Sequence, residues 1–231
     1  PQTASGQDRA ALFPAEAENC RICEDEPDHR GRGRDMKELS LHMLDIAQNS
    51  IAAGAGHMDL AVEETGGRII LTAADDGRGM PPELLATVAD PFTTTRATRK
   101  VGLGLPLLRM AAEMTGGHMD IESTLGVGTT VTAVFHAGHI DCPPLGDVAA
   151  TISLLAQGLP EHMDFTYIHR TRQGEFRFDT AEIRSILGPE VPLSEPEVAR
   201  WVKEYVEEGE TRVQCAHGEE KRTQDIGGVK S

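Results

Sequence analysis

Residues 74–80 read ADDGRGM, in which two adjacent acidic residues precede two glycines that are one residue apart. The preceding run, RIILTAAD, is typical of a strand, so Asp75 lies where the expected strand ends. A carboxylate there can accept a hydrogen bond from an amino group of a flat ligand, while Gly77 and Gly79 let the backbone approach that ligand. A surface turn is the alternative. A calcium loop is disfavoured, because such loops need further acidic residues at alternate positions and residues 78–82 provide none.

The composition excludes several classes of protein. The chain has 231 residues, of which 39% are hydrophobic, and can therefore bury a core. Its 37 acidic and 22 basic residues give a net charge of −15, which disfavours a nucleic-acid binder because it repels a phosphate backbone. No apolar run approaches the roughly 18 to 20 residues of a membrane span, and no signal peptide is recognisable. These observations predict a cytoplasmic protein with reduced cysteines that binds neither nucleic acid nor membrane.

Hydrophobic patterning divides the chain into four segments. Residues 1–35 and 210–231 have almost no apolar periodicity, and we expect a disordered leader and a disordered tail there. Residues 36–139 contain most of the patterned elements and are expected to form one domain. Residues 140–209 are expected to form a small C-terminal α+β subdomain.

The order of the expected elements predicts the fold class. They are a helix over 36–53, strands over 57–64 and 68–75, a helix over 81–88, a loop over 90–105 that leads into a helix ending at about 112, strands over 118–123 and 129–136, a helix near 147–157, strands over 163–169 and 175–179, and helices near 180–187 and 195–208. This order predicts an α+β protein, a two-layer α/β sandwich in which helices cover one face of a mostly antiparallel sheet, followed by a small C-terminal α+β appendage.

Two further stretches carry polar or glycine patterns at a helix. In the helix over 36–53, the residues Glu38, His42, Asp45 and Asn49 follow one another at steps of four, three and four, which usually marks a solvated face. Residues 101–107 read VGLGLPL, with a glycine pair directly before a helix, where free backbone N–H groups favour phosphate. A bare turn is the alternative. Neither a P-loop nor a dinucleotide fingerprint matches this stretch.

Five motifs taken together resemble the GHKL superfamily of ATP-binding domains, which includes sensor histidine kinases, type II topoisomerase and mismatch-repair ATPases, and the large heat-shock chaperone. The matching stretches are LDIAQNSIAAGA at 44–55 for the N box, DDGRGM at 75–80 for the first glycine box, DPFTTTR at 90–96 for the F box, GLGLPLLRMAAEMTGGHMDIES at 102–123 for the second glycine box, and LGVGTT at 125–130 for the last box. The resemblance implies the Bergerat, or histidine-kinase-like, ATPase fold.

The resemblance also implies roles for single residues. Asp75 would read adenine, with Gly77 and Gly79 shaping the wall of its pocket, and Asn49 would hold Mg²⁺ through its amide oxygen. Thr129 or Thr130 would support the adenine end. The phosphates would lie against Gly102, Leu103, Gly104 and Leu105, and a mobile lid would contain Phe92, Thr94 and the cations Arg96, Arg99 and Lys100. Arg96 and Lys100 are candidates to contact the γ-phosphate, with solvated lid cations as the alternative.

Asp45 is the candidate for catalysis of hydrolysis. It lies one helical turn before Asn49, where the hydrolysing members of the superfamily keep a glutamate that activates water. Aspartate is shorter by one methylene, so the alternative is that Asp45 only orients a water on the magnesium. His42, another turn earlier, is expected to support the site indirectly or to lie on the surface.

Departures from the histidine-kinase pattern shape the expected activity. Lys100 and Val101 stand where those kinases have Gly-Thr or Gly-Ser, and no helical hairpin with a phospho-acceptor histidine precedes the N box. The resemblance is therefore to small stand-alone bacterial members, and we expect an Mg·ATP-binding protein that transfers the γ-phosphate to a separate protein. One alternative is an ATP-hydrolysing switch that uses Asp45 and dimerises, and another is a non-enzymatic ATP sensor that binds a partner.

Two metal sites are weaker hypotheses. Cys20 and Cys23 have zinc-ligand spacing but lack a second pair. His136, His139 and Cys142 recur every third residue, and in an extended segment they would not all face one centre. Both sites are disfavoured.

Overall fold

The computed structural model describes residues 38–88, 104–188 and 190–214. Its elements are, in chain order, α1 (Leu39–Ala52), β1 (His57–Thr65), β2 (Arg68–Asp75), α2 (Pro82–Val88), α3 (Gly104–Met114), β3 (His118–Thr124), β4 (Gly128–His136), α4 (Val148–Gly158), β5 (Asp164–Thr171), β6 (Gly174–Asp179), α5 (Thr180–Leu187) and α6 (Pro196–Gln214). Each helix and strand expected within the described residues is present.

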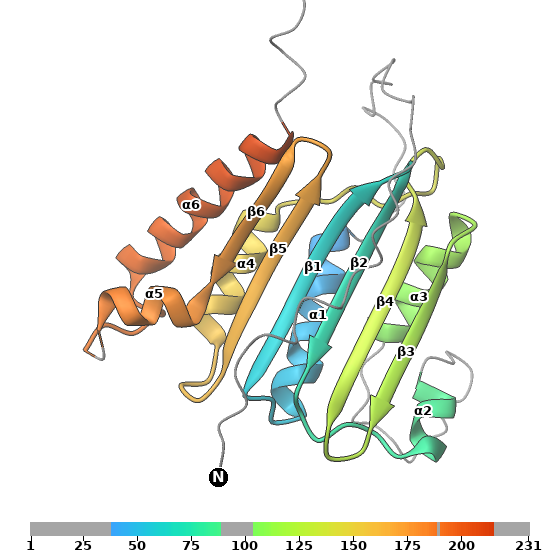
Figure 1. The fold of residues 1–231 in the computed structure, drawn as a ribbon, viewed down its shortest axis with the longest axis horizontal. Coiled ribbons are helices and arrows are strands. Elements are labelled where there is room, and N and C mark those ends of the chain that lie inside the picture. The colour runs from blue at the N-terminus through green and yellow to red at the C-terminus, as the bar shows by residue number, and fades with distance from the viewer. Residues whose placement is uncertain (1–37, 89–103, 189, 215–231) are drawn as a thin grey trace, which may run out of the picture.

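Six strands form one sheet in the order β3-β4-β2-β1-β5-β6 (Figure 1). Neighbouring strands are antiparallel, except for β1 and β5, which are parallel. Alternation along β1 shows which face is the core, because Met58, Leu60 and Val62 are buried, whereas His57 and Asp59 on the opposite face are half-buried and only the small Ala61 of that face is buried. The two-layer α/β sandwich with a mostly antiparallel sheet is thus confirmed.

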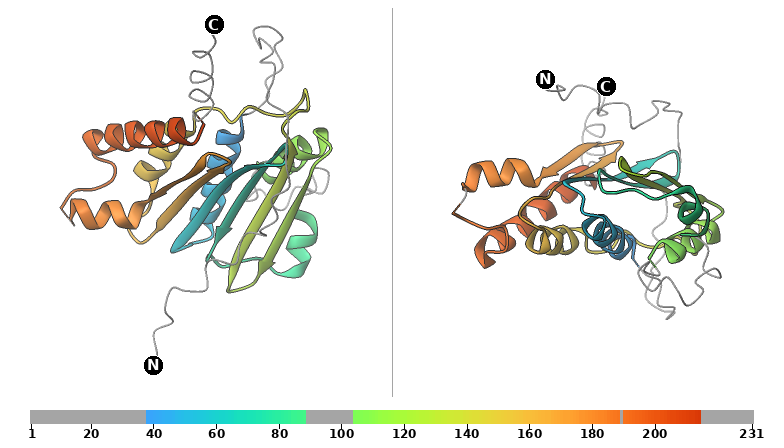
Figure 2. Two further views of the ribbon diagram at one scale, coloured as in Figure 1. Left: turned by 45° about the horizontal axis from the view of Figure 1, so that its top comes forward. Right: turned by 90° about the horizontal axis from the view of Figure 1, so that it is seen from below.

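Helices cover one face of this sheet. Figures 1 and 2 show α1 between α3 and α4 on that face, with α6 beside α4. In α1 the residues Leu39, Met43, Ile46 and Ala47 form a helical stripe that is buried against the sheet. Burying each large apolar side chain contributes about 1.5–3 kcal/mol. No helix in the described part of the chain is long and apolar enough to cross a membrane.

The C-terminal segment extends the same sheet. β5 pairs with β1 over the register from His57 opposite Asp164 to Glu63 opposite Arg170. The segment is α+β, as expected, and its two strands continue the sheet that the preceding segment begins. The division of the chain into a domain over 36–139 and a subdomain over 140–209 stays a prediction.

The tail boundary expected at residue 210 is wrong for the first residues after it. Helix α6 continues to Gln214, because its last turn packs against the sheet. Val213 is buried, and Thr171 Oγ1 of β5 donates a hydrogen bond of 2.6 Å to the Val213 carbonyl oxygen. The residues after Gln214, like residues 1–37, lie outside the described part of the chain.

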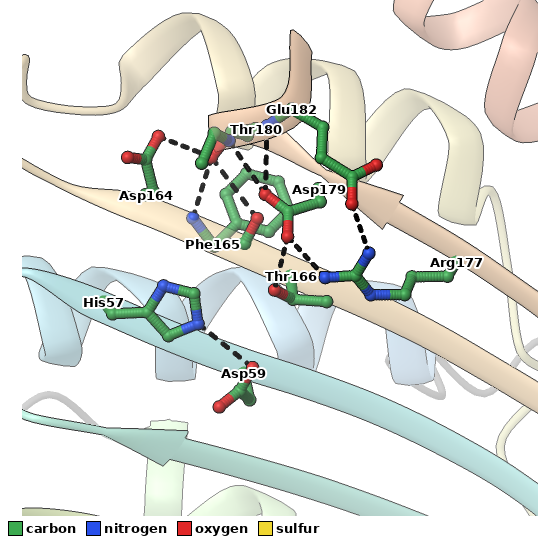
Figure 3. A network of polar contacts seen from close by, with 10 residues as sticks. His57, Asp59, Asp164, Phe165, Thr166, Arg177, Asp179, Thr180 and Glu182 are labelled. Atoms are coloured by element: carbon green, nitrogen blue, oxygen red, sulfur yellow. Dashed lines mark hydrogen bonds and ion pairs between the residues drawn. The ribbon is translucent and has the colours of Figure 1, made fainter. Parts of the chain in front are cut away.

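A polar network fixes the corner between β6 and α5 (Figure 3). Asp179 caps α5, since its Oδ1 accepts hydrogen bonds from the backbone nitrogens of Ala181 at 2.8 Å and Glu182 at 3.3 Å. Arg177 donates from one guanidinium nitrogen to Asp179 Oδ2 and from another to Glu182 Oε1, both at 2.6 Å. These contacts hold the direction in which the chain leaves the sheet.

Candidate functional site

Asp75 is held from two sides at the end of β2. Ser50 Oγ of α1 donates a hydrogen bond of 2.8 Å to Asp75 Oδ2, and the Gly77 backbone N–H donates one of 2.9 Å to Asp75 Oδ1. The carboxylate therefore faces the layer of helices and lies next to α1. Its orientation is set before any ligand is bound, which suits a group that reads a ligand by a hydrogen bond.

Thr129 lies directly opposite Asp75, on the adjacent strand β4. Ser123 of β3 joins it to the first glycine box: the Ser123 and Thr129 hydroxyl oxygens are 2.9 Å apart, and Ser123 Oγ accepts a hydrogen bond of 2.8 Å from Met80 N. Ser123 Oγ also lies 3.0 Å from the Gly128 carbonyl oxygen. The adenine candidates Asp75 and Thr129 are thus neighbours within one hydrogen-bonded frame.

The two adjacent acids of ADDGRGM do different things. Asp76 Oδ1 accepts hydrogen bonds from the backbone nitrogens of Gly56 at 2.7 Å and His57 at 2.8 Å. Asp76 therefore fixes the turn between α1 and β1, whereas Asp75 faces the helix layer. Of the two acids, Asp75 therefore stays the candidate for contacting a ligand.

Gly79 is required by backbone packing. Its φ is +62°, and a Cβ at this position would overlap the carbonyl oxygen of Thr124. The backbone at Gly128 packs equally closely against the end of β2, since a Cβ there would overlap the carbonyl oxygen of Asp75. At Gly77 a Cβ would come 2.8 Å from the Cβ of Ala53 in the turn after α1. The glycines bring three segments close together around Asp75.

The helix α1 and the start of α3 meet at Asp45. A Cβ on Gly104, the first residue of α3, would lie 2.8 Å from the Asp45 Cβ. Asn49 is one turn further along α1, and both it and Asp45 are half-buried. His42, one turn before Asp45, is 2% exposed, so its expected position on the surface is wrong and the supporting position remains. The polar stripe of α1 is therefore only partly solvated.

Of the residues expected at the lid and the phosphates, two are described by the structure. Gly104 and Leu105 lie in the first turn of α3, and the Leu105 side chain is buried in the core, so only its backbone can face a ligand. The other candidates lie outside the described residues, namely Phe92, Thr94, Arg96, Arg99, Lys100, Gly102 and Leu103.

Of the two disfavoured metal sites, the one at His136, His139 and Cys142 lies within the described residues. Within residues 38–88, 104–188 and 190–214, no group of three His, Cys, Asp or Glu side chains could hold a metal ion. His139 Nδ1 instead accepts a hydrogen bond of 3.1 Å from Asp141 N, and Cys142 Sγ lies 3.7 Å from the Pro143 carbonyl oxygen. Burial raises the pKa of the Cys142 thiol. Cys20 and Cys23 lie outside the described residues.

A buried charge cluster joins β1, β5 and α6. His169 is fully buried, with its Nδ1 2.8 Å from Glu210 Oε2 and its Nε2 3.1 Å from Glu64 Oε1. Burial lowers the pKa of His169, but the hydrogen bonds to the two carboxylates outweigh it and raise the pKa to about 9. Tyr167 donates a hydrogen bond of 3.0 Å to Glu210 Oε1. Burial and the Glu210 charge raise the Tyr167 pKa well above its usual range.

Ser50 and Ser123 are site residues that the sequence did not single out. Ser50 directly follows Asn49, and Ser123 ends the run HMDIES. Serine is common on surfaces and at helix ends, so neither residue carries a signal unless the partner that its hydroxyl contacts is known.

Comparisons with known proteins show a similarity to one family of ATPases over part of this chain. Residues 34–139 match the family described as "Histidine kinase-, DNA gyrase B-, and HSP90-like ATPase". The sensor histidine kinase ZraS of Klebsiella oxytoca is 33% identical over 132 residues, which are 57% of this chain and 27% of that protein. The histidine protein kinase DivJ of Caulobacter vibrioides is 34% identical over 103 residues, which are 43% of this chain and 17% of that protein.

Solved structures give weaker likenesses. The N-terminal domain of a DNA repair protein aligns with a TM-score of 0.45 and 16% identity, covering 66% of this chain and 57% of that one. The catalytic domain of the histidine kinase ThkA aligns with a TM-score of 0.34 and 20% identity, covering 42% of this chain and 64% of that one. By its motifs and by the family match, residues 34–139 of this chain are similar to the ATP-binding domains of the histidine kinase-, DNA gyrase B- and HSP90-like ATPase family.

Proposed function

We propose that the protein binds ATP together with Mg²⁺ and transfers the γ-phosphate to a separate protein. The observation that carries the proposal is the Asp75 carboxylate, which is oriented by Ser50 and Gly77 beside Thr129. The curated relatives ZraS and DivJ, which carry the name histidine kinase, support a kinase rather than another ATP-dependent activity. This chain spans about a quarter or less of their length, so their whole activity is not transferred to it.

The adenine end would be read by Asp75 and Thr129. A carboxylate only accepts hydrogen bonds, so Asp75 suits the 6-amino group of adenine, which only donates. Thr129 has a hydroxyl that donates and accepts, and it lies opposite Asp75 on β4. The pair would therefore hold the base at the end of the sheet nearest α1.

The phosphate end would lie between α1 and α3. The N-terminus of α3 offers free backbone N–H groups to an anion, and Asp45 lies beside its first residue, Gly104. Asn49 and Asp45 present oxygen atoms on one side of α1, and oxygen donors suit Mg²⁺, so the residues fit the ion. When bound, the ion would neutralise phosphate charge. Arg96 and Lys100 stay candidates for contacting the γ-phosphate.

The proposed acceptor is a nucleophile on another protein. In the described residues the one histidine in a helix is His42, which is 2% exposed and therefore cannot present its ring to a phosphate. Phosphoryl transfer would break the bond between the γ-phosphorus and the bridging oxygen, leave ADP, and place the phosphoryl group on the nucleophile of the partner.

Hydrolysis is the second candidate, and the position of Asp45 favours it. A carboxylate beside the N-terminus of α3 would lie near the phosphates and could accept a proton from an attacking water. In that case the same binding site would drive a conformational switch rather than a phosphotransfer.

The test is an incubation of the full chain with γ-labelled ATP and Mg²⁺, alone and with cell extract. Label that moves to an extract protein supports the kinase, and free phosphate that disappears in Asp45→Asn supports hydrolysis. If neither product forms despite tight binding, both activities are refuted and an ATP-sensing role follows.

Binding variants test the site itself. Asp75→Asn should weaken ATP binding about 10- to 100-fold, because the charge and one of the two acceptor oxygens are lost and an NH₂ donor takes the place of that oxygen. Asn49→Ala should weaken Mg·ATP binding but leave magnesium-free nucleotide binding nearly unchanged. Asp120→Asn, which changes a largely exposed carboxylate on β3, is the matched control. Wild-type affinity in both site variants would refute the proposed binding mode.

A further inference from the structure

Ser50 has a buried hydroxyl that orients Asp75. It is 1% exposed, and its Oγ lies 2.8 Å from Asp75 Oδ2 and 3.4 Å from the Ile46 carbonyl oxygen. A serine has a single hydroxyl proton to donate. The shorter of the two contacts is to a charged carboxylate oxygen, so Ser50 donates its hydrogen bond to Asp75 rather than to Ile46. Burying a hydroxyl group costs free energy unless the group forms a hydrogen bond. Here the hydrogen bond is formed with Asp75, the candidate for adenine recognition.

The bond from Ser50 decides how the Asp75 carboxylate is turned. Rotation about the last side-chain torsion of aspartate is broad, so one hydrogen bond leaves the plane of the carboxylate loosely defined. Gly77 N holds Oδ1 from the loop after β2, and Ser50 Oγ holds Oδ2 from α1. Two donors from different segments fix the plane. A carboxylate has about four lone-pair positions, and those left over then point in fixed directions.

We infer that Ser50 is a positioning residue that gives the nucleotide site its preference for a 6-amino purine by fixing the plane of Asp75. The inference rests on the proposed binding of adenine by Asp75. Removing the hydroxyl leaves the carboxylate in place but lets it turn, so a ligand amino group loses an oriented acceptor. Contacts to the ribose and the phosphates lie elsewhere and are unaffected.

The test compares two nucleotides that differ only at the 6-position. Dissociation constants of the full chain are measured by calorimetry for ATP and for purine riboside 5′-triphosphate, which lacks the amino group. Wild type should prefer ATP. Ser50→Ala should weaken ATP binding roughly three- to tenfold and leave binding of the purine riboside triphosphate unchanged, so the ratio of the two constants falls.

Ser153→Ala is the matched control. Ser153 is another buried helical serine, whose Oγ donates a hydrogen bond of 2.7 Å to the Ala199 carbonyl oxygen in the contact between α4 and α6. Its loss should lower stability without changing the nucleotide ratio. Ser50→Cys, which keeps the volume with a weaker donor, serves where Ser50→Ala folds poorly and should change the ratio in the same direction.

The outcomes separate this inference from the proposed function. If wild type prefers ATP but Ser50→Ala and Ser50→Cys keep the wild-type ratio, the inference is overturned while adenine reading by Asp75 stands. If wild type does not distinguish the two nucleotides, adenine reading itself fails, and the role of Ser50 fails with it. In an Asp75→Asn background, Ser50→Ala should cause no further change in the ratio, and a further change would overturn the inference.

Discussion

The stability of the protein should fall as the pH rises from 6.5 to 9, because of His169. Its pKa is about 9 in the folded protein and 6.5 in an unfolded chain, since Glu210 and Glu64 hold the buried imidazolium. A group whose pKa is raised on folding stabilises the fold fully below its unfolded pKa and loses that contribution as the pH passes its folded pKa. At about 1.4 kcal/mol per pKa unit, the contribution is about 3 kcal/mol.

The assay is urea unfolding of wild type and His169→Gln at pH 6, 7.5 and 9.5. The single tryptophan, Trp201, lies in α6 stacked on Tyr205, with ring centroids 5.2 Å apart, so its fluorescence reports the helix that Glu210 ties to β5. The free energy of unfolding of wild type should exceed that of the variant most at pH 6. The excess should shrink by about 3 kcal/mol at pH 9.5.

The comparison with the variant cancels the side chains that lie far from His169, because these titrate alike in both proteins, and it reports the coupled group of His169, Glu210 and Glu64. His118→Gln is the control, since His118 is largely exposed beside Asp120 on β3 and should give a difference of less than about 1 kcal/mol. A difference between wild type and His169→Gln that is the same at pH 6 and pH 9.5 would refute the reasoning. It would mean that His169 is buried in the neutral state.

Three further substitutions test packing. Gly209→Ala should lower the melting temperature, because a Cβ at this position in α6 would overlap the Phe176 ring, and Trp201 fluorescence reports the loss. Gly79→Ala should destabilise by more than about 2 kcal/mol and abolish nucleotide binding, measured by urea unfolding and calorimetry, since its φ is +62° and the clash is with backbone. Asp179→Ala should cost about 1–2 kcal/mol in urea unfolding, because the backbone nitrogens of Ala181 and Glu182 lose their acceptor, and an unchanged free energy of unfolding would contradict this role of the α5 cap.

Local elements could be predicted from the sequence because their signals are local. Alternation of apolar and polar residues marks β1, and its buried members Met58, Leu60 and Val62 follow that period. Helical spacing likewise predicts α1, but the face that it buries differs from the expected one: Leu41, expected on the apolar face, is 40% exposed, whereas Leu39 and Ile46 are buried. The position at which α6 ends could not be predicted from the local sequence, because the end of the helix is held by Thr171 and His169, which are about 40 residues earlier in the chain.

The site shows the same limit. Motif order places Asp75, Gly104 and Asn49 in one family pattern, and the structure brings Asp75 beside α1 and Gly104 beside Asp45. What the pattern cannot show is which donor holds a carboxylate. Ser50 is 25 positions from Asp75 in sequence, and only the packing of α1 against the end of β2 brings the hydroxyl to it.

The C-terminal segment is tied to the candidate site by more than its peptide connection. The backbone nitrogens of Gly56 and His57 donate to Asp76, the residue after Asp75. On the other side of that turn, Asp164 N at the start of β5 donates a hydrogen bond of 3.0 Å to the Gly56 carbonyl oxygen. A displacement of residues 75–76 must therefore carry the turn with it or break hydrogen bonds, and the turn carries the first residue of β5. β5 in turn holds α6 through the hydrogen bond between His169 and Glu210. A continuous path of hydrogen-bonded neighbours therefore runs from the end of β2, through the turn before β1 and through β5, to the last helix.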